Sequence, residues 1–286
     1  MLYNAALVLE GGAFRGQYTA GVVDTFLAHH IEFDSVIGVS AGSLCGANFV
    51  SKQYGRAAMI NINHRHDRDY ISFSHLLHRQ TIINLDYLFE DHGWRWENFN
   101  ERAYERSASN FTAVATSMVT GKAVSFTNPV GDELTRALKA SSSMPIIAKP
   151  QRTSKGLCLD GGVADSIPYD LAQQQGYDKI VVIRTRDITY RKEPTSRTLA
   201  SLYERYYGRD YPLFVRAAIN RPTVYNHQVE EINRLTKEKK LFTIAPQQPV
   251  KVSRIEGNVK KLRQLYETGQ REARSILPQM IKYLEH

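Results

Sequence analysis

The sequence predicts an α/β protein with a mostly parallel sheet, because a strand, a tight turn and a helix follow one another twice near the N-terminus. The apolar run 5–10 leads into the glycine turn 11–16, after which apolar side chains recur at helical spacing. The second run, 35–39, ends at Ser40, and the small residues that follow would let a helix lie close to a sheet. A helix after each strand is the usual connection between parallel strands.

Further strands and helices follow in order along the chain. Residues 53–106 are mostly polar with a helical tendency, and residues 86–99 are weakly amphipathic. The strands expected beyond this region are 111–118, 123–126 (joined by a turn at 120–122), 156–159, 179–185 and 241–245. The helices expected are 132–140, a helix from Pro168 to Gly176, helical patterns within 187–240, and one helix or two over 258–284.

Composition and charge narrow the class of protein. The 286 residues are 42% apolar, which suffices for a sizeable core, and they carry a formal charge of +8. The basic residues are dispersed, so a solvated basic surface and an anionic partner both stay open, and no nucleic acid is expected. No apolar run is long enough to span a membrane, and the N-terminus lacks the pattern of a signal peptide. The two cysteines, Cys45 and Cys158, favour a reduced, cytoplasmic setting.

The serine between two glycines matches a nucleophile elbow. Gly38-Val39-Ser40-Ala41-Gly42 stands between a strand and a helix, where a serine side chain is exposed by a sharp turn. Small flanking residues are required, since bulkier ones would clash. A glycine-rich turn with an N-capping serine is the alternative, and the five-residue pattern alone does not decide between them.

The glycine-rich loop that follows the first strand also has two interpretations. As a dinucleotide-binding turn it lacks the middle glycine, where the chain has Ala13. As an oxyanion hole it needs only consecutive backbone N–H groups, and Ala13 can supply one if its φ is negative. Arg15 would add positive charge or brace the loop, and both roles stay open.

A serine nucleophile needs a proton acceptor, and the histidines are poorly placed for that role. After Asp160 the chain has only His227, in a polar helical stretch, and the terminal His286. Asp160 follows a short apolar run and precedes Gly161 and Gly162, which would let the carboxylate approach another turn closely. A strand-end aspartate in an ordinary turn is the alternative.

Four motifs in this order resemble the patatin-like phospholipase family. They are Leu-Glu-Gly-Gly-Ala-Phe-Arg-Gly, Gly-Val-Ser-Ala-Gly, Ala-Ser-Ser-Ser-Met-Pro and Leu-Asp-Gly-Gly, and the resemblance spans residues 5–185. It implies a three-layer α/β/α fold over 1–186, with 187–286 as a helical extension packed on the same domain, similar to a bacterial branch of the family.

The resemblance also implies a set of site residues. Ser40 would be the nucleophile and Asp160 its base, without metal or cofactor. The oxyanion segment would comprise Gly11, Gly12, Ala13, Arg15 and Gly16, with Ala13 departing from the usual glycine. The apolar groove for the acyl chain has as its candidates Phe14, Leu44, Met144, Ile146 and Ile147, any of which could instead be ordinary core.

The expected function is hydrolysis of lipid carboxylic esters, as in a phospholipase A or lysophospholipase. The partner is a lipid or other acyl ester, with peripheral contact at the inner face of a membrane left open. A non-catalytic or regulatory lipid-binding protein on the same fold is the alternative, and a nucleotide-binding protein is disfavoured by Ala13. The Tyr- and Arg-rich segment 187–240 is expected to form a cap, a surface for anionic headgroups, or helical packing at the edge of the domain.

Overall fold

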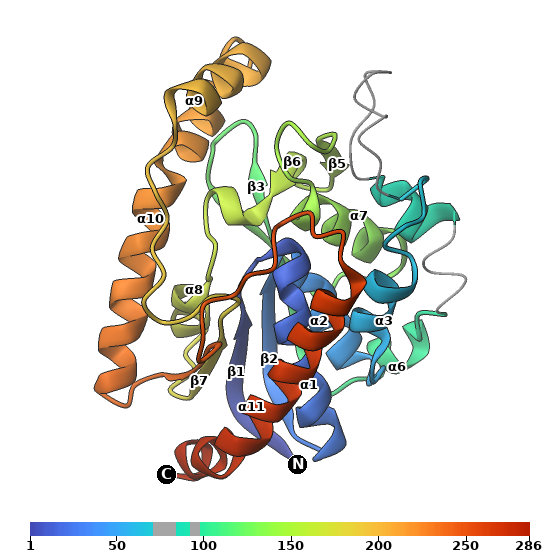
Figure 1. The fold of residues 1–286 in the computed structure, drawn as a ribbon, viewed down its shortest axis with the longest axis vertical. Coiled ribbons are helices and arrows are strands. Elements are labelled where there is room, and N and C mark those ends of the chain that lie inside the picture. Colours follow the sequence, from blue (N-terminus) through green and yellow to red (C-terminus); the bar gives the residue numbers. More distant parts are fainter. Residues whose placement is uncertain (71–83, 92–97) are drawn as a thin grey trace.

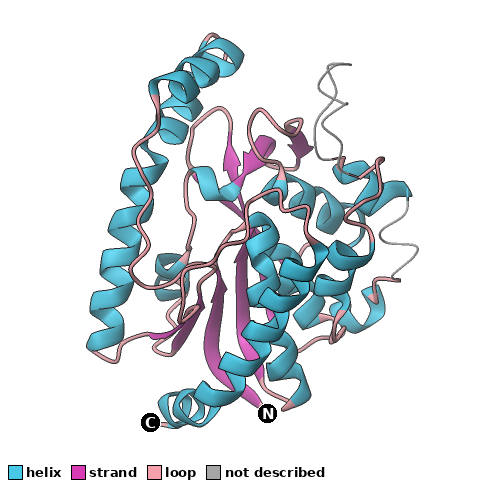
Figure 2. Cartoon of the chain, in the orientation of Figure 1, coloured by secondary structure: helices cyan, strands magenta, loops and turns pink. Residues whose placement is uncertain are grey.

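An eight-stranded sheet lies between two layers of helices in the computed structural model, which describes residues 1–70, 84–91 and 98–286 (Figures 1 and 2). The strand order is β5-β6-β3-β2-β1-β7-β8, and β4 pairs with β3. The strands are β1 (Leu2–Leu9), β2 (Glu32–Val39), β3 (Asn110–Ser117), β4 (Ala123–Thr127), β5 (Gln151–Thr153), β6 (Gly156–Asp160), β7 (Ile180–Ile183) and β8 (Phe242–Ile244). Four neighbouring pairs of strands are parallel, namely β3–β2, β2–β1, β1–β7 and β7–β8. This confirms the predicted α/β class with a mostly parallel sheet.

The helices cover both faces of the sheet. They are α1 (Gly16–Ala28), α2 (Ala41–Val50), α3 (Arg56–Asn63), α6 (Glu101–Glu105), α7 (Gly131–Ser142), α8 (Tyr169–Gln174), α9 (Arg197–Tyr203), α10 (Pro212–Lys237) and α11 (Val259–Glu285). Short 3₁₀ or π segments are η1 (Ala13–Arg15), η2 (Tyr87–Asp91), η3 (Gly161–Val163) and η4 (Glu204–Gly208). None of these helices is long and apolar enough to cross a lipid bilayer.

Alternate residues of β1 point into two different cores, as the pleat of a strand requires. Leu7 and Leu9 pack with apolar side chains of α1, α2 and α11, whereas Ala6 and Val8 pack with those of α8 and α10. Both sets are fully buried, which explains why β1 is a continuous apolar run instead of an alternating one.

The ends of β2 and β6 meet beside β3. Residues 112–114 of β3 pair with both β2 and β4, so those two strands lie on opposite sides of β3. Residues 115 and 116 pair with both β4 and β6, which puts β6 on the side of β2. Val39 pairs with Val114 and Asp160 with Ala115, so the parallel strand β2 and the antiparallel strand β6 approach each other end to end.

The part of the chain after residue 187 shares this sheet and core. β8 pairs in parallel with β7, and α11 lies along α1 (Figure 1). The loop 245–258 between them passes over the carboxyl ends of the parallel strands (Figure 1). The domain boundary at residue 186 stays a prediction.

Several predicted elements need correction in their bounds. β1 begins at Leu2 and β2 at Glu32, three residues earlier than expected in each case. Pro168 precedes α8 instead of being its first residue, and the final segment is a single helix, α11. Of the amphipathic stretch 86–99, residues 92–97 lie outside the described residues, and the beginning forms η2. The predicted hairpin of β3 and β4 is confirmed.

α1 and α11 cross at two glycines. A Cβ on Gly21 would lie 2.1 Å from the carbonyl oxygen of Tyr266, and a Cβ on Gly269 would lie 2.2 Å from that of Tyr18. Both positions have helical neighbours, so glycine is used here for close approach of two backbones and not for a turn.

We therefore expect Gly269→Ala to lower the stability of the protein. In an ordinary helix interior this change stabilises by about 1 kcal/mol, but here the methyl group must push α11 away from α1, at a cost of about 1–3 kcal/mol. We expect a lower urea midpoint. Glu267→Ala, on the exposed side of the same helix, should change the midpoint little, and a stabilising Gly269→Ala would contradict the close crossing.

Candidate active site

Ser40 lies at the carboxyl end of β2, on the sharp turn into α2. Its φ and ψ are 54° and −123°, a region that serine rarely adopts, so the turn holds it in a strained conformation. Its amide donates to Ser141 Oγ (2.8 Å), and Ser141 Oγ donates to the carbonyl oxygen of Val114 (2.6 Å). α7 thus supplies the hydroxyl that ties the turn to β3.

Two glycines of the elbow allow this packing. Gly38 is in β2, and Gly42 is in the first turn of α2, where a Cβ would lie 2.3 Å from the carbonyl oxygen of Leu9. α2 can therefore begin directly beside the end of β1, which brings the loop after β1 next to Ser40.

Asp160 is the last residue of β6 and contacts Ser40 directly. Ser40 Oγ donates to Asp160 Oδ2 (2.7 Å), and the amide of Gly162 donates to Oδ1 (2.8 Å). The amide of Asp160 donates to the carbonyl oxygen of Ser143 (2.8 Å). Both side chains are buried, with 6% of Ser40 and 3% of Asp160 exposed. The two residues, 120 positions apart in sequence, thus form a held hydroxyl–carboxylate pair.

Gly161 allows β6 to end this close to β3, because a Cβ there would lie 2.1 Å from the carbonyl oxygen of Val114. Gly162 lies beneath the guanidinium group of Arg221, which a Cβ at that position would approach to 2.9 Å. Both glycines predicted to support Asp160 therefore lie where the backbone is crowded.

The glycine loop passes over Ser40. A Cβ on Gly11 would lie 3.3 Å from Ser40 Cβ, and the Gly11 amide donates to the carbonyl oxygen of Ser166 (3.3 Å). The amides of Gly12 and Ala13 donate to no acceptor within the described residues. Gly16 begins α1 and packs against Ala41. Of the expected donors, Gly12 and Ala13 are thus the two with an uncommitted N–H, whereas that of Gly11 holds the loop in place.

Ala13 departs from the sequence expectation. The argument from sequence required a negative φ, and the observed φ is 49°. In this left-handed region an alanine is strained by about 1–2 kcal/mol relative to glycine. The direction of its N–H follows from the peptide plane and not from the side chain, so the amide still has the orientation that glycine would give it.

An apolar pocket opens on one side of Ser40. Phe14, Leu44 and Met144 line it, together with Leu85 and Leu88. Two of the expected groove residues are elsewhere: Ile146 packs in a cluster around Met118 and Phe214, and Ile147 packs against the main core. A second apolar hollow continues from Leu44 along α2 and α3 to Ile60.

On its other side Ser40 faces a polar pocket, half of whose lining residues the sequence did not predict. The region after 187 contributes Tyr190, Lys192, Arg221, Tyr225 and Arg254, and Arg15 and Arg186 complete its cationic lining. Part of the Tyr- and Arg-rich segment therefore lies at the site, in addition to packing on the sheet. The abundance of Tyr and Arg in that segment was the signal, but no spacing tied these residues to Ser40.

Arg15 is buried and makes no ion pair within the described residues, and its Nε has no hydrogen-bond partner. Burial, with the nearby charges of Arg186 and Arg254, lowers its pKa to about 10, so it stays charged at neutral pH. The Arg15 amide donates to the carbonyl oxygen of Gly12 (3.1 Å), but within the described residues its guanidinium group donates to no loop carbonyl. This favours a role of the side chain as a positive charge over a role as a brace.

The histidines considered as alternative bases lie away from Ser40. His227 is exposed on α10, and no histidine lines the pockets described around Ser40. Cys45 and Cys158 are both buried and free.

Comparison with known proteins identifies the family to which the chain belongs. A sequence profile described as "Patatin-like phospholipase" matches residues 7–172. The chain belongs to the patatin-like phospholipase family. This membership makes it, at the general level, a hydrolase of lipid esters. A second profile, for a domain of unknown function, matches residues 211–285 of this patatin-like chain.

Individual relatives of this patatin-like protein are distant. It is 27% identical over 288 positions to "Uncharacterized protein YjjU" of Escherichia coli K12, an alignment that covers 98% of this chain and 78% of the relative. It is 25% identical over 217 positions to "Probable lipid hydrolase 463L" of Invertebrate iridescent virus 6, which covers 66% of this chain and 73% of the viral protein. The crystal structure of VipD from Legionella pneumophila is similar with a TM-score of 0.47 and 10% identity, over 97% of this chain and 67% of VipD.

Ala13→Gly should relieve the strain in the loop. A glycine adopts a φ of 49° without a Cβ penalty, so we expect the free energy of unfolding to rise by up to about 1 kcal/mol. Urea denaturation would measure the change. Ala200→Gly in α9 is the matched control, because the same substitution in an ordinary helix should lower stability by about 0.5–1 kcal/mol. Equal losses in both variants would contradict a strained Ala13.

Proposed function

We propose that the chain hydrolyses carboxylic esters of lipids through a Ser40–Asp160 dyad and an acyl-enzyme, in the manner of a phospholipase A or lysophospholipase. The observation that carries the proposal is the 2.7 Å hydrogen bond from Ser40 Oγ to Asp160 Oδ2, on a strained elbow in the pocket that Gly12 and Ala13 also line. Substrate approach from a membrane surface in the cytoplasm belongs to the same proposal.

In the first step Ser40 Oγ attacks the carbonyl carbon of the ester, and its proton passes to Asp160 Oδ2. The carbonyl oxygen becomes an oxyanion, towards which the amides of Gly12 and Ala13 donate. Preorganised amide donors of this kind each contribute about 10²–10³ in rate. Arg15 adds a fixed positive charge to the same loop.

In the second step the C–O bond to the alcohol breaks, and the departing oxygen takes the proton from Asp160. The acyl group stays on Ser40 Oγ, with its chain in the apolar pocket of Phe14, Leu44 and Met144. Water then attacks the acyl carbon as Asp160 takes one of its protons. Collapse of the second oxyanion releases the fatty acid and returns the proton to Ser40.

A carboxylate suffices as the base because its position is fixed. One oxygen of Asp160 accepts from Gly162 and the other from Ser40, so the carboxylate does not need a third residue to orient it. A histidine base, by contrast, usually needs a carboxylate to fix its tautomer and orientation.

A serine-reactive fluorophosphonate probe tests the nucleophile. We expect it to label the wild-type protein once, and to leave Ser40→Ala unlabelled because no other activated hydroxyl is present at the elbow. Ser201→Ala, at an exposed serine of α9, is the control and should label like the wild type. A folded wild-type protein that never labels would favour the non-catalytic lipid-binding alternative.

Asp160→Asn tests the base. The amide keeps the shape of the side chain but cannot accept the proton of Ser40, so kcat for a soluble ester should fall by about 10²–10⁴. The exposed His227 is the control position, and His227→Gln should retain the wild-type rate. If the loss followed His227→Gln instead, a histidine would be the base. Circular dichroism would verify that both variants are folded.

A further inference from the structure

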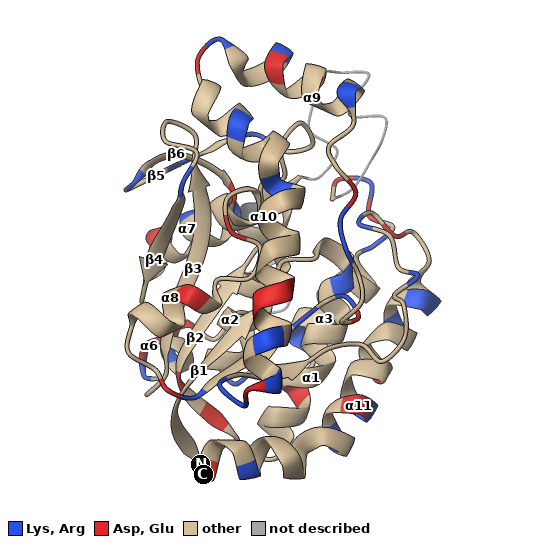
Figure 3. Ribbon diagram, turned by 90° about the vertical axis from the view of Figure 1, so that its left-hand side faces the viewer, with Lys and Arg blue, Asp and Glu red and all other residues tan. Residues whose placement is uncertain are grey.

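The polar pocket beside Ser40 contains more positive than negative charge. Its cationic lining consists of Arg15, Arg186, Lys192, Arg221 and Arg254, and its only carboxylates are Glu10 and Asp160. Basic positions elsewhere are spread over many elements of the ribbon (Figure 3). The convergence of five cations on one pocket is therefore a local feature and not a consequence of the overall charge.

Both carboxylates of the pocket are already engaged by other donors. Glu10 accepts from the amide of Thr185 (2.5 Å) and from the hydroxyl of Tyr225 (2.9 Å), and Asp160 accepts from Ser40 and Gly162. Within the described residues none of the five cations makes an ion pair closer than 4 Å. The cations are thus left without a matching anion.

Several buried nitrogens in this pocket have no hydrogen-bond acceptor in the part of the chain that the structure describes. The Nε atoms of Arg15, Arg186 and Arg221 are buried and unpartnered. Among the described residues, the contacts of Lys192 Nζ are with the hydroxyl of Ser166 (3.2 Å) and the ring face of Tyr225 (3.6 Å to its centroid). Buried donors are nearly always satisfied in folded proteins, so these nitrogens are available to an anionic ligand.

The cations also destabilise one another. Burial and then the charge of Arg221 lower the pKa of Lys192 well below its ordinary value, and burial lowers that of Arg221 while Asp160 opposes the shift. An anion in the pocket would offset the repulsion and raise the pKa of Lys192 towards its ordinary value. Several guanidinium groups around one anion are the usual way in which proteins bind phosphate.

The cationic pocket also lies next to Ser40, on the side opposite the apolar pocket. It shares Ser40, Ala13, Met144 and Arg254 with the apolar pocket, so the two pockets meet at the nucleophile. In a glycerophospholipid an acyl ester and the phosphate are attached to the same glycerol unit. A lipid whose chain lies in the apolar pocket would therefore have its phosphate on the cationic side.

We propose that this cationic pocket binds the phosphate of the lipid substrate and selects lipids with a small anionic headgroup over zwitterionic ones. The inference rests on the proposed function, and it assigns Lys192, Arg221 and Arg254 of the C-terminal region as specificity residues. A quaternary ammonium group would meet uncompensated positive charge here, whereas a phosphate monoester would meet several donors.

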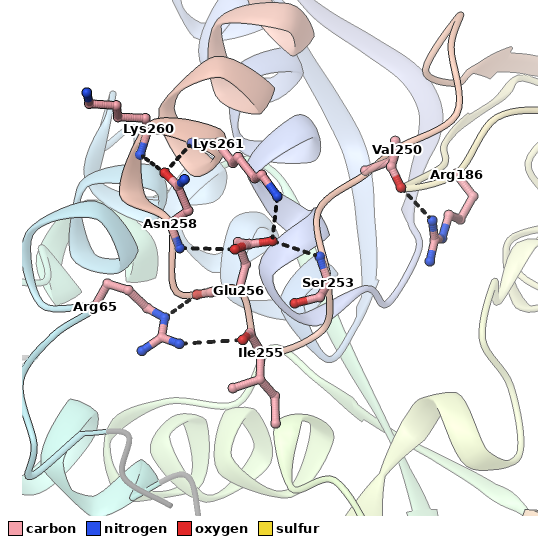
Figure 4. A network of polar contacts seen from close by, with 9 residues as sticks. All are labelled: Arg65, Arg186, Val250, Ser253, Ile255, Glu256, Asn258, Lys260 and Lys261. Carbon is pink, nitrogen blue, oxygen red and sulfur yellow. Dashed lines mark hydrogen bonds and ion pairs between the residues drawn. The ribbon is translucent and has the colours of Figure 1, made fainter.

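The loop that carries Arg254 is held in position from both sides (Figure 4). Arg186 Nη1 donates to the carbonyl oxygen of Val250 (2.8 Å), and Arg65 donates to those of Ile255 and Glu256. The carboxylate of Glu256 accepts from the amides of Ser253 (3.3 Å) and Asn258 (3.0 Å). Arg254 is exposed between these anchors, so its side chain can be replaced without disturbing the core.

Binding to a catalytically silent protein tests the pocket independently of the chemistry. Ser40→Ala would be titrated calorimetrically with dihexanoyl phosphatidate and with dihexanoyl phosphatidylcholine, both as monomers. We expect tighter binding of the phosphatidate, and about tenfold weaker binding after adding Arg254→Gln, the loss of one charge-assisted hydrogen bond. Lys251→Gln, an equal loss of charge at an exposed residue of the same loop, should leave the affinity unchanged.

Hydrolysis provides the second measurement. The ratio of kcat/KM for dihexanoyl phosphatidate to that for dihexanoylglycerol should exceed one in the wild type and fall about tenfold in Arg254→Gln, mostly through KM. Equal binding of the two phospholipids together with an unchanged ratio would overturn the proposal while leaving the ester hydrolase intact. Selective binding without any turnover or probe labelling would overturn the proposed function instead.

Inorganic phosphate distinguishes the source of the anion. As a competitor it should raise the KM for the phosphatidate in the wild type, and less so in Arg254→Gln. If free phosphate binds in an Arg254-dependent way but phosphatidate is not preferred over phosphatidylcholine, the pocket serves a free anion and the headgroup proposal is wrong.

Discussion

The end-to-end meeting of β2 and β6 along β3 is the constraint on which the site depends. Neighbouring residues of β3 pair with Val39 and Asp160, so the turn after β2 and the end of β6 lie next to each other. α7 then links the two ends, because the hydroxyl of Ser141 accepts from Ser40 N and the carbonyl of Ser143 accepts from Asp160 N. The motif Ala-Ser-Ser-Ser-Met-Pro thus has a structural reason: two of its serines position the backbones of the pair.

Strain is concentrated where this geometry is needed. Ser40 and Ala13 both have a φ near +50°, a region that costs a residue with a Cβ about 1–2 kcal/mol. Each is held by surrounding hydrogen bonds or packing, and each lies at the pocket where a carbonyl oxygen would become charged. The strain is offset by a sheet whose central parallel strands, β1, β2, β3 and β7, are buried over most of their length. A small, weakly packed domain could not hold two such positions in place.

The sequence predicted Ser40, Asp160 and their glycines better than it predicted the cationic pocket, and the reason is physical. Gly-x-Ser-x-Gly and Asp-Gly-Gly are short motifs that can be recognised in the sequence, although the backbones that require glycine at Gly42 and Gly161 are those of Leu9 and Val114, far away along the chain. Arg221 and Arg254 reach the pocket only because α10 and the loop before α11 pack across the sheet, and no short-range pattern encodes that packing. The φ of Ala13 was unpredictable for a related reason: alanine normally avoids positive φ, so only the surrounding fold reveals that it adopts it.

The two pockets at Ser40 also show what the C-terminal region adds to the site by packing on the sheet. The N-terminal motifs place the proposed nucleophile, the proposed base and the apolar pocket, and by themselves they set no preference among esters. β8 and α11 anchor the loop 245–258 at both of its ends, so Arg254 is positioned by packing that also stabilises the fold. A change that loosened α11 from α1 would therefore shift the cationic lining while leaving the Ser40–Asp160 pair in place, because that pair is held by β3, by Ser141 of α7 and by the amide of Gly162. The stability of α11 and the proposed recognition of the headgroup are in this way coupled, whereas the positions of Ser40 and Asp160 depend on neither.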